Sequence, residues 1–149
     1  MLDAELQIVE SLVVDLSEGT NQSSTPFSLD RRGFPSNLCG VIHIEDVTAD
    51  DNVDPVDFVF QVAVDGGTVW HDVASITLEG NDGASLKGPY SVPLGPMDFR
   101  AEIRATTDIE IRVDVRYANS CATDNLTFSA YLGVGNPYPH FASAATYHE

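Results

Sequence analysis

The stretch DFRAEIRATTDIEIRVDVRY, Asp98–Tyr117, decides the fold class. It contains two runs in which apolar and charged residues alternate strictly, and the polar residues Thr106, Thr107 and Asp108 separate them. Successive residues of a strand point to opposite faces of a sheet, so each run is typical of a strand with one buried face. The short polar break predicts a hairpin. We therefore expect an antiparallel sheet with one face in the core and one in solvent.

The charged residues of this stretch predict the register of the hairpin. If Ala105 lies opposite Ile109, opposite charges face each other at four successive outward positions. Each such pair contributes roughly 0.2–1 kcal/mol, so the ladder selects the register more than it stabilises the fold. The pairs are Arg104–Glu110, Glu102–Arg112, Arg100–Asp114 and Asp98–Arg116.

Length and charge limit the classes of function. A chain of 149 residues fits one domain with a core of its own. Seven Lys and Arg against 23 Asp and Glu give a net charge of −16, which excludes a nucleic-acid or membrane partner, because both need clustered basic side chains. We expect a partner that is basic or that binds through apolar and backbone contacts. The chain has no apolar run of the ~18 residues that span a membrane and no signal-peptide layout, so it is made in the cytoplasm or has lost a signal.

Further alternating segments complete an all-β prediction. Asp65-Gly66-Gly67-Thr68 has the composition of a hairpin turn between two of them. Gly88, Pro89 and Pro93 interrupt another, which is typical of an edge strand. We expect a single antiparallel β-sandwich of about eight strands over residues 1–134, jelly-roll-like or immunoglobulin-like. The predicted segments are 5–16 (with a bulge or kink near Glu10, and a short helix as the alternative), 41–47, 58–64, 69–78, 86–94 and 126–134.

Two segments lack strand periodicity. Residues 17–38 are rich in Ser, Thr, Asn, Gly and Pro, and loops of this length tend to be functional or mobile. Their apolar residues either anchor the loop on the core or belong to an arm that reaches a neighbouring subunit. Residues 135–149 form a tail that is either disordered or an extended arm whose aromatic residues dock on a partner.

The sequence offers no arrangement typical of catalysis. His43 and His71 are expected on solvent faces, His140 and His148 lie in the tail, and none has the spacing of a metal site. We therefore expect no enzyme activity, no cofactor and no metal.

Three features leave alternatives open. The acidic segment 46–57 is either a solvated turn or a calcium site, although its spacing does not match an EF-hand. Cys39 and Cys121, both near predicted strand ends, are two ordinary thiols or one disulfide. Trp70 is either a core or turn-capping residue or a platform for a ligand.

Several motifs together resemble a known family. They are MLDAEL at residues 1–6 with VVDL at 13–16, the hairpin FVFQVAVDGGTVW at 58–70, GPYSVPL at 88–94, FRAEIR at 99–104 and AYLG at 130–133. This chain resembles the small β-sandwich cement, or decoration, proteins on the capsids of tailed bacteriophages. The resemblance implies a jelly roll without catalytic residues, often trimeric, that binds the major capsid protein on the exterior of the virion.

The long loop and the tail match no motif of that family. We nevertheless expect them to supply the contacts to the partner. The candidate partner-binding residues are Phe27, Arg31, Arg32 and Phe34 in the loop, and Tyr138, Phe141 and Tyr147 in the tail.

A second hypothesis is a carbohydrate- or receptor-binding module of a phage tail or an adhesin. It requires an exposed aromatic platform, for which Trp70, Tyr90 and Tyr131 are the candidates.

Overall fold

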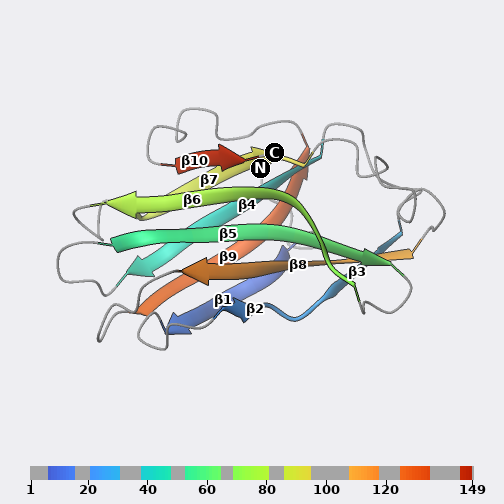
Figure 1. Cartoon of the computed structure of the whole chain (residues 1–149), viewed down its shortest axis with the longest axis horizontal. Helices are drawn as coiled ribbons and strands as arrows, with labels where there is room; N and C mark the ends of the chain where they lie inside the picture. Colours follow the sequence, from blue (N-terminus) through green and yellow to red (C-terminus); the bar gives the residue numbers. More distant parts are fainter. Residues whose placement is uncertain are drawn as a thin grey trace.

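Alternating apolar residues form the inner faces of two antiparallel sheets in a computed structural model of the chain (Figure 1). The structure describes residues 7–15, 21–30, 38–47, 53–64, 69–80, 86–94, 108–117, 125–134 and 145–148. Sheet A has the strand order β1-β9-β4-β7, and sheet B has the order β10-β6-β5-β8-β2, with β3 also paired to β8. The strands are β1 (Gln7–Asp15), β2 (Gln22–Ser23), β3 (Phe27–Asp30), β4 (Leu38–Val47), β5 (Val53–Val64), β6 (His71–Gly80), β7 (Gly88–Pro93), β8 (Asp108–Tyr117), β9 (Asn125–Val134) and β10 (Ala145–His148).

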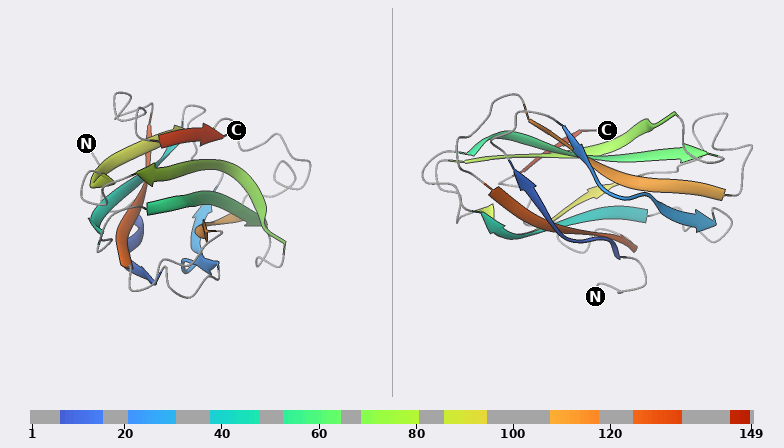
Figure 2. Two further views of the ribbon diagram at one scale, coloured as in Figure 1. Left: turned by 60° about the vertical axis from the view of Figure 1, so that its left-hand side comes forward. Right: turned by 90° about the horizontal axis from the view of Figure 1, so that it is seen from below.

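The strand order identifies the sandwich as a jelly roll. The pairs β1–β9, β2 and β3 with β8, β4–β7 and β5–β6 are nested inside one another, as in one long hairpin. The hairpin is rolled up because β9 also pairs with β4 and β8 also pairs with β5. If β2 and β3 are counted as one interrupted strand, this is the eight-stranded jelly-roll architecture. The predicted all-β, jelly-roll-like sandwich is confirmed, and the two layers are visible in Figure 2.

The core lies between the two sheets. Phe58 of β5 and Phe128 of β9 are fully buried and meet edge to face, with ring centroids 5.0 Å apart. Gly40 of β4 faces the ring of Phe60, and a Cβ on Gly40 would lie 2.4 Å from the Cζ of that ring. Only glycine allows the two sheets to approach this closely here.

Two predicted irregularities are present. The register of β1 against β9 shifts on both sides of Val9, close to the bulge expected near Glu10. Ser11 in this region has φ 44°, a left-handed conformation that non-glycine residues rarely adopt. At the edge of sheet A, β7 begins at Gly88 (φ 132°) and contains the two prolines that predicted an edge strand.

The predicted charge ladder is wrong in the part that the structure describes. β8 pairs with β5 along one side, and with β3 at Asp108–Ile111 and β2 at Asp114–Val115 along the other. Both sides of β8 are therefore occupied where the ladder would run, while residues 98–107 lie outside the described residues. The alternation itself is confirmed, because Ile109, Ile111, Val113 and Val115 are all buried. The charges of β8 meet partners from strands distant in sequence.

Part of the predicted loop 17–38 forms β2 and β3 on the edge of sheet B. The break between them contains Pro26, which cannot donate to the ladder. Ser24 bridges the break: its N–H donates to the Val113 carbonyl, and its Oγ accepts from the Val113 N–H, both at 2.9 Å.

The end of the predicted tail also returns to the body. Residues 145–148 form β10, which pairs with β6 at the edge of sheet B, outside the nested pairs of the roll. This segment is therefore a strand and not an arm directed away from the domain. Residues 135–144 lie outside the described part of the chain.

Candidate functional site

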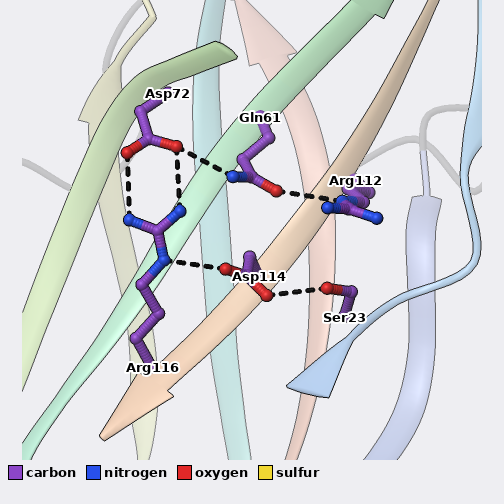
Figure 3. Close-up of polar contacts among 6 residues, drawn as sticks. All are labelled: Ser23, Gln61, Asp72, Arg112, Asp114 and Arg116. Carbon is purple, nitrogen blue, oxygen red and sulfur yellow. Dashed lines mark hydrogen bonds and ion pairs between the residues drawn. The ribbon is translucent and has the colours of Figure 1, made fainter. Parts of the chain in front are cut away.

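A network of polar side chains crosses the outer face of sheet B (Figure 3). Its members come from β2, β5, β6 and β8, which are far apart in the sequence and adjacent in the sheet. We call this network the outer lattice; it consists of Ser23, Gln61, Asp72, Arg112, Asp114 and Arg116.

A β-bulge in β6 places the central residue of the lattice. Ala74 lies opposite Phe60 and Asp72 lies opposite Gln61, so Val73 is an extra residue in β6. Strict alternation from the buried Ala74 would point Asp72 into the core, whereas the bulge turns it to the outer face. The bulge also places half-buried His71 opposite Val62, on the core side, so the prediction that His71 points to solvent is wrong.

Asp72 and Arg116 form a bidentate ion pair. The two terminal nitrogens of Arg116 donate to the two carboxylate oxygens of Asp72, each at 2.9 Å. Its Nε donates to Oδ2 of Asp114 at 2.7 Å, and Oδ1 of Asp114 accepts from Ser23 Oγ at 2.7 Å. The hydrogen bonds from Asp72 and then Asp114 raise the pKa of the Arg116 guanidinium. Since the side chain of Asp114 is only 10% exposed, Arg116 neutralises a nearly buried carboxylate.

The other branch of the lattice ends on an aromatic ring. Gln61 is 5% exposed; its Nε2 donates to Asp72 at 2.8 Å, and its Oε1 accepts from Arg112 Nε at 2.9 Å. The guanidinium carbon of Arg112 lies 4.1 Å from the centroid of the Trp70 ring, a cation–π contact. The lattice thus connects four strands through side-chain hydrogen bonds, an arrangement that stiffens a sheet.

A shallow pocket lies beside the Asp72–Arg116 pair. Its volume is about 300 Å³, and Val59, which is 4% exposed, belongs to its lining. Val73 adds apolar surface, while Asp57, Ser75 and the ion pair add polar groups. Ala74 also lines the pocket, although its side chain belongs to the core. Asp57 accepts a hydrogen bond from Thr77 Oγ1.

A second polar cluster lies on the outer face of sheet A. We call it the bulge clamp; it consists of Ser11, Glu45 and Ser129. Ser129 Oγ accepts from the N–H of Ser11 at 3.0 Å and donates to Glu45 at 2.6 Å, and Ser11 Oγ donates to Glu45 at 2.8 Å. The register of β4 shifts at Glu45, so the clamp joins a bulge in β1 to a bulge in β4 across β9. The hydrogen bonds from Ser129 and then Ser11, together with the charge of His43, lower the pKa of Glu45.

The structure places two of the seven predicted partner-binding residues. Phe27 lies on β3, half-buried and packed against the core, as the anchoring alternative predicted. Tyr147 lies on β10 opposite Ile76. The predicted residues Arg31, Arg32, Phe34, Tyr138 and Phe141 lie outside the described residues.

The aromatic platform required by the second hypothesis is not formed by its three candidates. Tyr90 is 2% exposed, and its hydroxyl donates to the Leu86 carbonyl at 2.8 Å. Trp70 is half-buried, and Arg112 covers one face of its ring. Tyr131 is half-buried, on the other sheet, and its hydroxyl accepts from Gln7 Nε2 at 3.1 Å.

Two alternatives from the sequence concern a disulfide between Cys39 and Cys121 and a calcium site in the segment 46–57. Cys39 is a free thiol with no exposed surface, and burial raises its pKa; Cys121 lies outside the described residues. Asp46 forms an ion pair with Lys87 at 3.3 Å, whereas Asp50 and Asp51 are not described. Among the residues with a described structure, no three His, Cys, Asp or Glu side chains gather as metal ligands, and no helix could span a membrane.

Comparisons with known proteins leave the site to be interpreted from its geometry. No protein-family model, no curated protein and no solved structure matches the chain. Sequence reasoning missed the outer lattice, because its pairs depend on strand neighbours that alternation does not specify. One signal was present: the alternation of β6 assigns Asp72 to the core face, where a carboxylate is costly, and that conflict indicates a bulge.

Proposed function

We propose that the protein is a structural, non-catalytic decoration protein that binds the outer surface of a tailed-phage capsid. The observation that carries the proposal is the jelly-roll arrangement of the nine strands from β1 to β9. This architecture is used by viral capsid domains as well as by lectins and cupins. The motif resemblance described above adds to it. The outer lattice suits the same role, because side-chain hydrogen bonds across four strands stiffen the outer face of sheet B.

The physical basis is a bridging contact. A subunit that binds two neighbouring capsid proteins adds its own interface energy to the seam between them, and specific interfaces bury about 1,200–2,000 Å² in total. The acidic chain, with a net charge of −16, favours basic or apolar surfaces on the shell. In this proposal the protein is made in the host cytoplasm, assembles as a trimer and ends on the exterior of the virion.

The fold changes the set of residues that we propose as contacts to the capsid. Phe27 packs against the domain's own core, which leaves less of its ring for a partner. The loop residues Arg31, Arg32 and Phe34 and the tail residues Tyr138, Phe141 and Tyr147 remain the proposed contacts. Tyr147 adds a backbone element, because β10 is an edge strand to which a partner strand can pair.

The test is sedimentation with shells. Full-length protein is mixed with tailed-phage shells that lack decoration protein, and its native mass is measured alone and in the mixture. We expect a trimer that sediments with the shells. A monomer that never sediments with any shell would overturn the proposal.

Two variants locate the contacts. Deletion of residues 136–149 removes the tail and also β10, which uncovers the edge of β6. A triple substitution, Tyr138→Ser, Phe141→Ser and Tyr147→Ser, keeps the backbone of the tail and serves as the matched variant. We expect both to fold, as judged by circular dichroism, and neither to load; normal loading of both would exclude the tail as a contact.

The second candidate function is binding of a carbohydrate or a receptor, which the use of the jelly-roll architecture by lectins favours. The covered ring of Trp70 and the buried Tyr90 argue against a stacking platform for sugars. A glycan array decides between the two functions. Saturable binding to one glycan class, lost on Asp72→Asn, would support the second candidate over the first.

A further inference from the structure

The pocket on sheet B is lined by both apolar and polar residues. Val59 is 4% exposed, and the bulged residue Val73 is half-buried. Asp57, Asp72 and Ser75 add carboxylates and a hydroxyl to the lining. The volume of about 300 Å³ exceeds what a single water molecule needs. A side chain can therefore enter with its carbon atoms against the two valines and its polar end near the carboxylates.

The charges around the pocket determine whether the polar end of an entering side chain should be positive or negative. Among the residues that line the pocket, Asp57 and Asp72 carry −2 and Arg116 carries +1, so their sum is −1. Arg116 is engaged by Asp72 and Asp114, and the hydrogen bond that Asp57 accepts comes from the neutral Thr77. Within the described part of the chain, no basic side chain engages Asp57. An anion would meet net repulsion here, whereas a cation would find a carboxylate without an ionic partner.

The residues that line the pocket argue against a sugar as its ligand. Sugars bind largely by stacking on exposed aromatic rings, and none of the described residues that line the pocket is aromatic. Lysine and arginine side chains have the matching form, since they place methylene groups on apolar surface and keep the charge at a wet, acidic rim.

We infer that this pocket is a docking site for a lysine or arginine side chain presented by a protein partner. The inference names the partner chemistry for the binding role proposed above and rests on that role only for the identity of the partner. The net charge of −16 would steer a basic segment towards the domain, and Asp57 would then fix the position of its cation.

The probes are three blocked peptides, acetyl-Gly-Lys-Gly-amide, acetyl-Gly-Arg-Gly-amide and acetyl-Gly-Gln-Gly-amide. Each is titrated into the full-length protein, and the methyl NMR signals of Val59 and Val73 are followed. We expect saturable shifts at these methyl groups with at least one basic peptide and none with the glutamine peptide. The stronger of the two basic peptides identifies the preferred cation.

Two variants separate the pocket from general attraction to an acidic protein. Asp57→Asn retains an acceptor for Thr77, and we expect it to weaken binding roughly 1.4- to 5-fold, the factor for an ion pair of about 0.2–1 kcal/mol. Glu110→Gln makes the same change of charge on β8, outside the pocket lining, and should leave the affinity unchanged. Equal effects of the two variants, or equal shifts with the glutamine peptide, would overturn the inference.

This outcome is independent of the shell experiment. Peptide binding without sedimentation would retain the pocket and remove the capsid as the partner. Sedimentation that is unchanged by Asp57→Asn, together with no peptide binding, would retain the decoration role and remove the pocket from it.

Discussion

The outer lattice of sheet B and the bulge clamp of sheet A both connect strands near a β-bulge, but they use different chemical groups. In each, a β-bulge disrupts the ladder and a carboxylate near it accepts hydrogen bonds. The clamp joins three strands: two hydroxyls donate to the carboxylate of Glu45, and the N–H of Ser11 donates to the hydroxyl of Ser129. The lattice uses two arginines and extends over four strands, and a pocket remains beside it. The comparison shows that a few neutral donors are enough to connect strands at a bulge, whereas the charged network connects more strands and has a pocket beside it.

A substitution in the core between the two sheets should cause the largest loss of stability, and the smaller losses expected in the two polar clusters can be compared with it. Gly40→Ala places a Cβ against the buried ring of Phe60, and we expect a loss of about 3 kcal/mol, at the upper end of overpacking costs. Urea unfolding measures it. The double variant with Phe60→Leu should lose less than the sum of the two single variants. Strict additivity would contradict the predicted clash.

Removal of the central cation breaks the lattice. Arg116→Met leaves Asp114 nearly buried without a positive partner, and we expect a loss of about 2 kcal/mol, reduced from the fully buried case because Arg116 is 34% exposed. Arg112→Met, which removes one hydrogen bond and the contact with Trp70, should lose about 1 kcal/mol. Thermal unfolding compares them. Equal losses would mean that Asp114 gains no stability from its pairing.

Removal of the central hydroxyl opens the clamp. Ser129→Ala deprives Glu45 of one donor and the Ser11 N–H of its acceptor, and we expect a loss of about 1 kcal/mol. Ser75→Ala, an outward serine on β6, is the matched control and should change stability by less than about 0.5 kcal/mol. Amide hydrogen exchange at Ser11 should accelerate only in Ser129→Ala. Unchanged exchange there would exclude the clamp as a fastener of β1.

The smallest effect is a difference in pH dependence. The pKa of Glu45 is lowered in the folded state, so its contribution to stability is complete above the unfolded value of 4.5 and disappears as the pH falls through the folded pKa. When the pH is lowered from 5 to about 3, the Glu45→Gln variant should therefore lose less stability than the unsubstituted protein loses. Glu10→Gln, on the exposed side of β1, is the control. Parallel pH curves for all three proteins would contradict the clamp geometry.

The sequence predicts the faces of the strands better than their neighbours. Alternation correctly assigned Ile42 and Phe58 to the core, and the jelly-roll-like sandwich followed from such runs. The charge ladder failed because alternating charges are compatible with any antiparallel partner, and Arg116 meets Asp72, 44 residues away. Register across distant strands depends on the closure of the whole roll.

Apart from the conflict at Asp72, the site could not be predicted, for a related reason. The bulge at Val73 changes the face of every β6 residue before it, and a one-residue insertion leaves no mark in composition. β2 consists of two residues, too few to show alternation, and β10 of four. Cross-strand contacts and not local propensity hold such short elements.

The pairing of β1 with β9 has a consequence for synthesis on the ribosome. Gln7 lies opposite Tyr131, 124 residues later in the sequence, so the first strand of the roll meets its partner only after all the other strands of the roll have been translated. Until then β4 also lacks β9, its longer neighbour in sheet A. A nascent chain of this protein carries unpaired strand edges through most of its elongation, and such edges are prone to aggregation. The strong negative charge keeps these growing chains apart from one another during that interval.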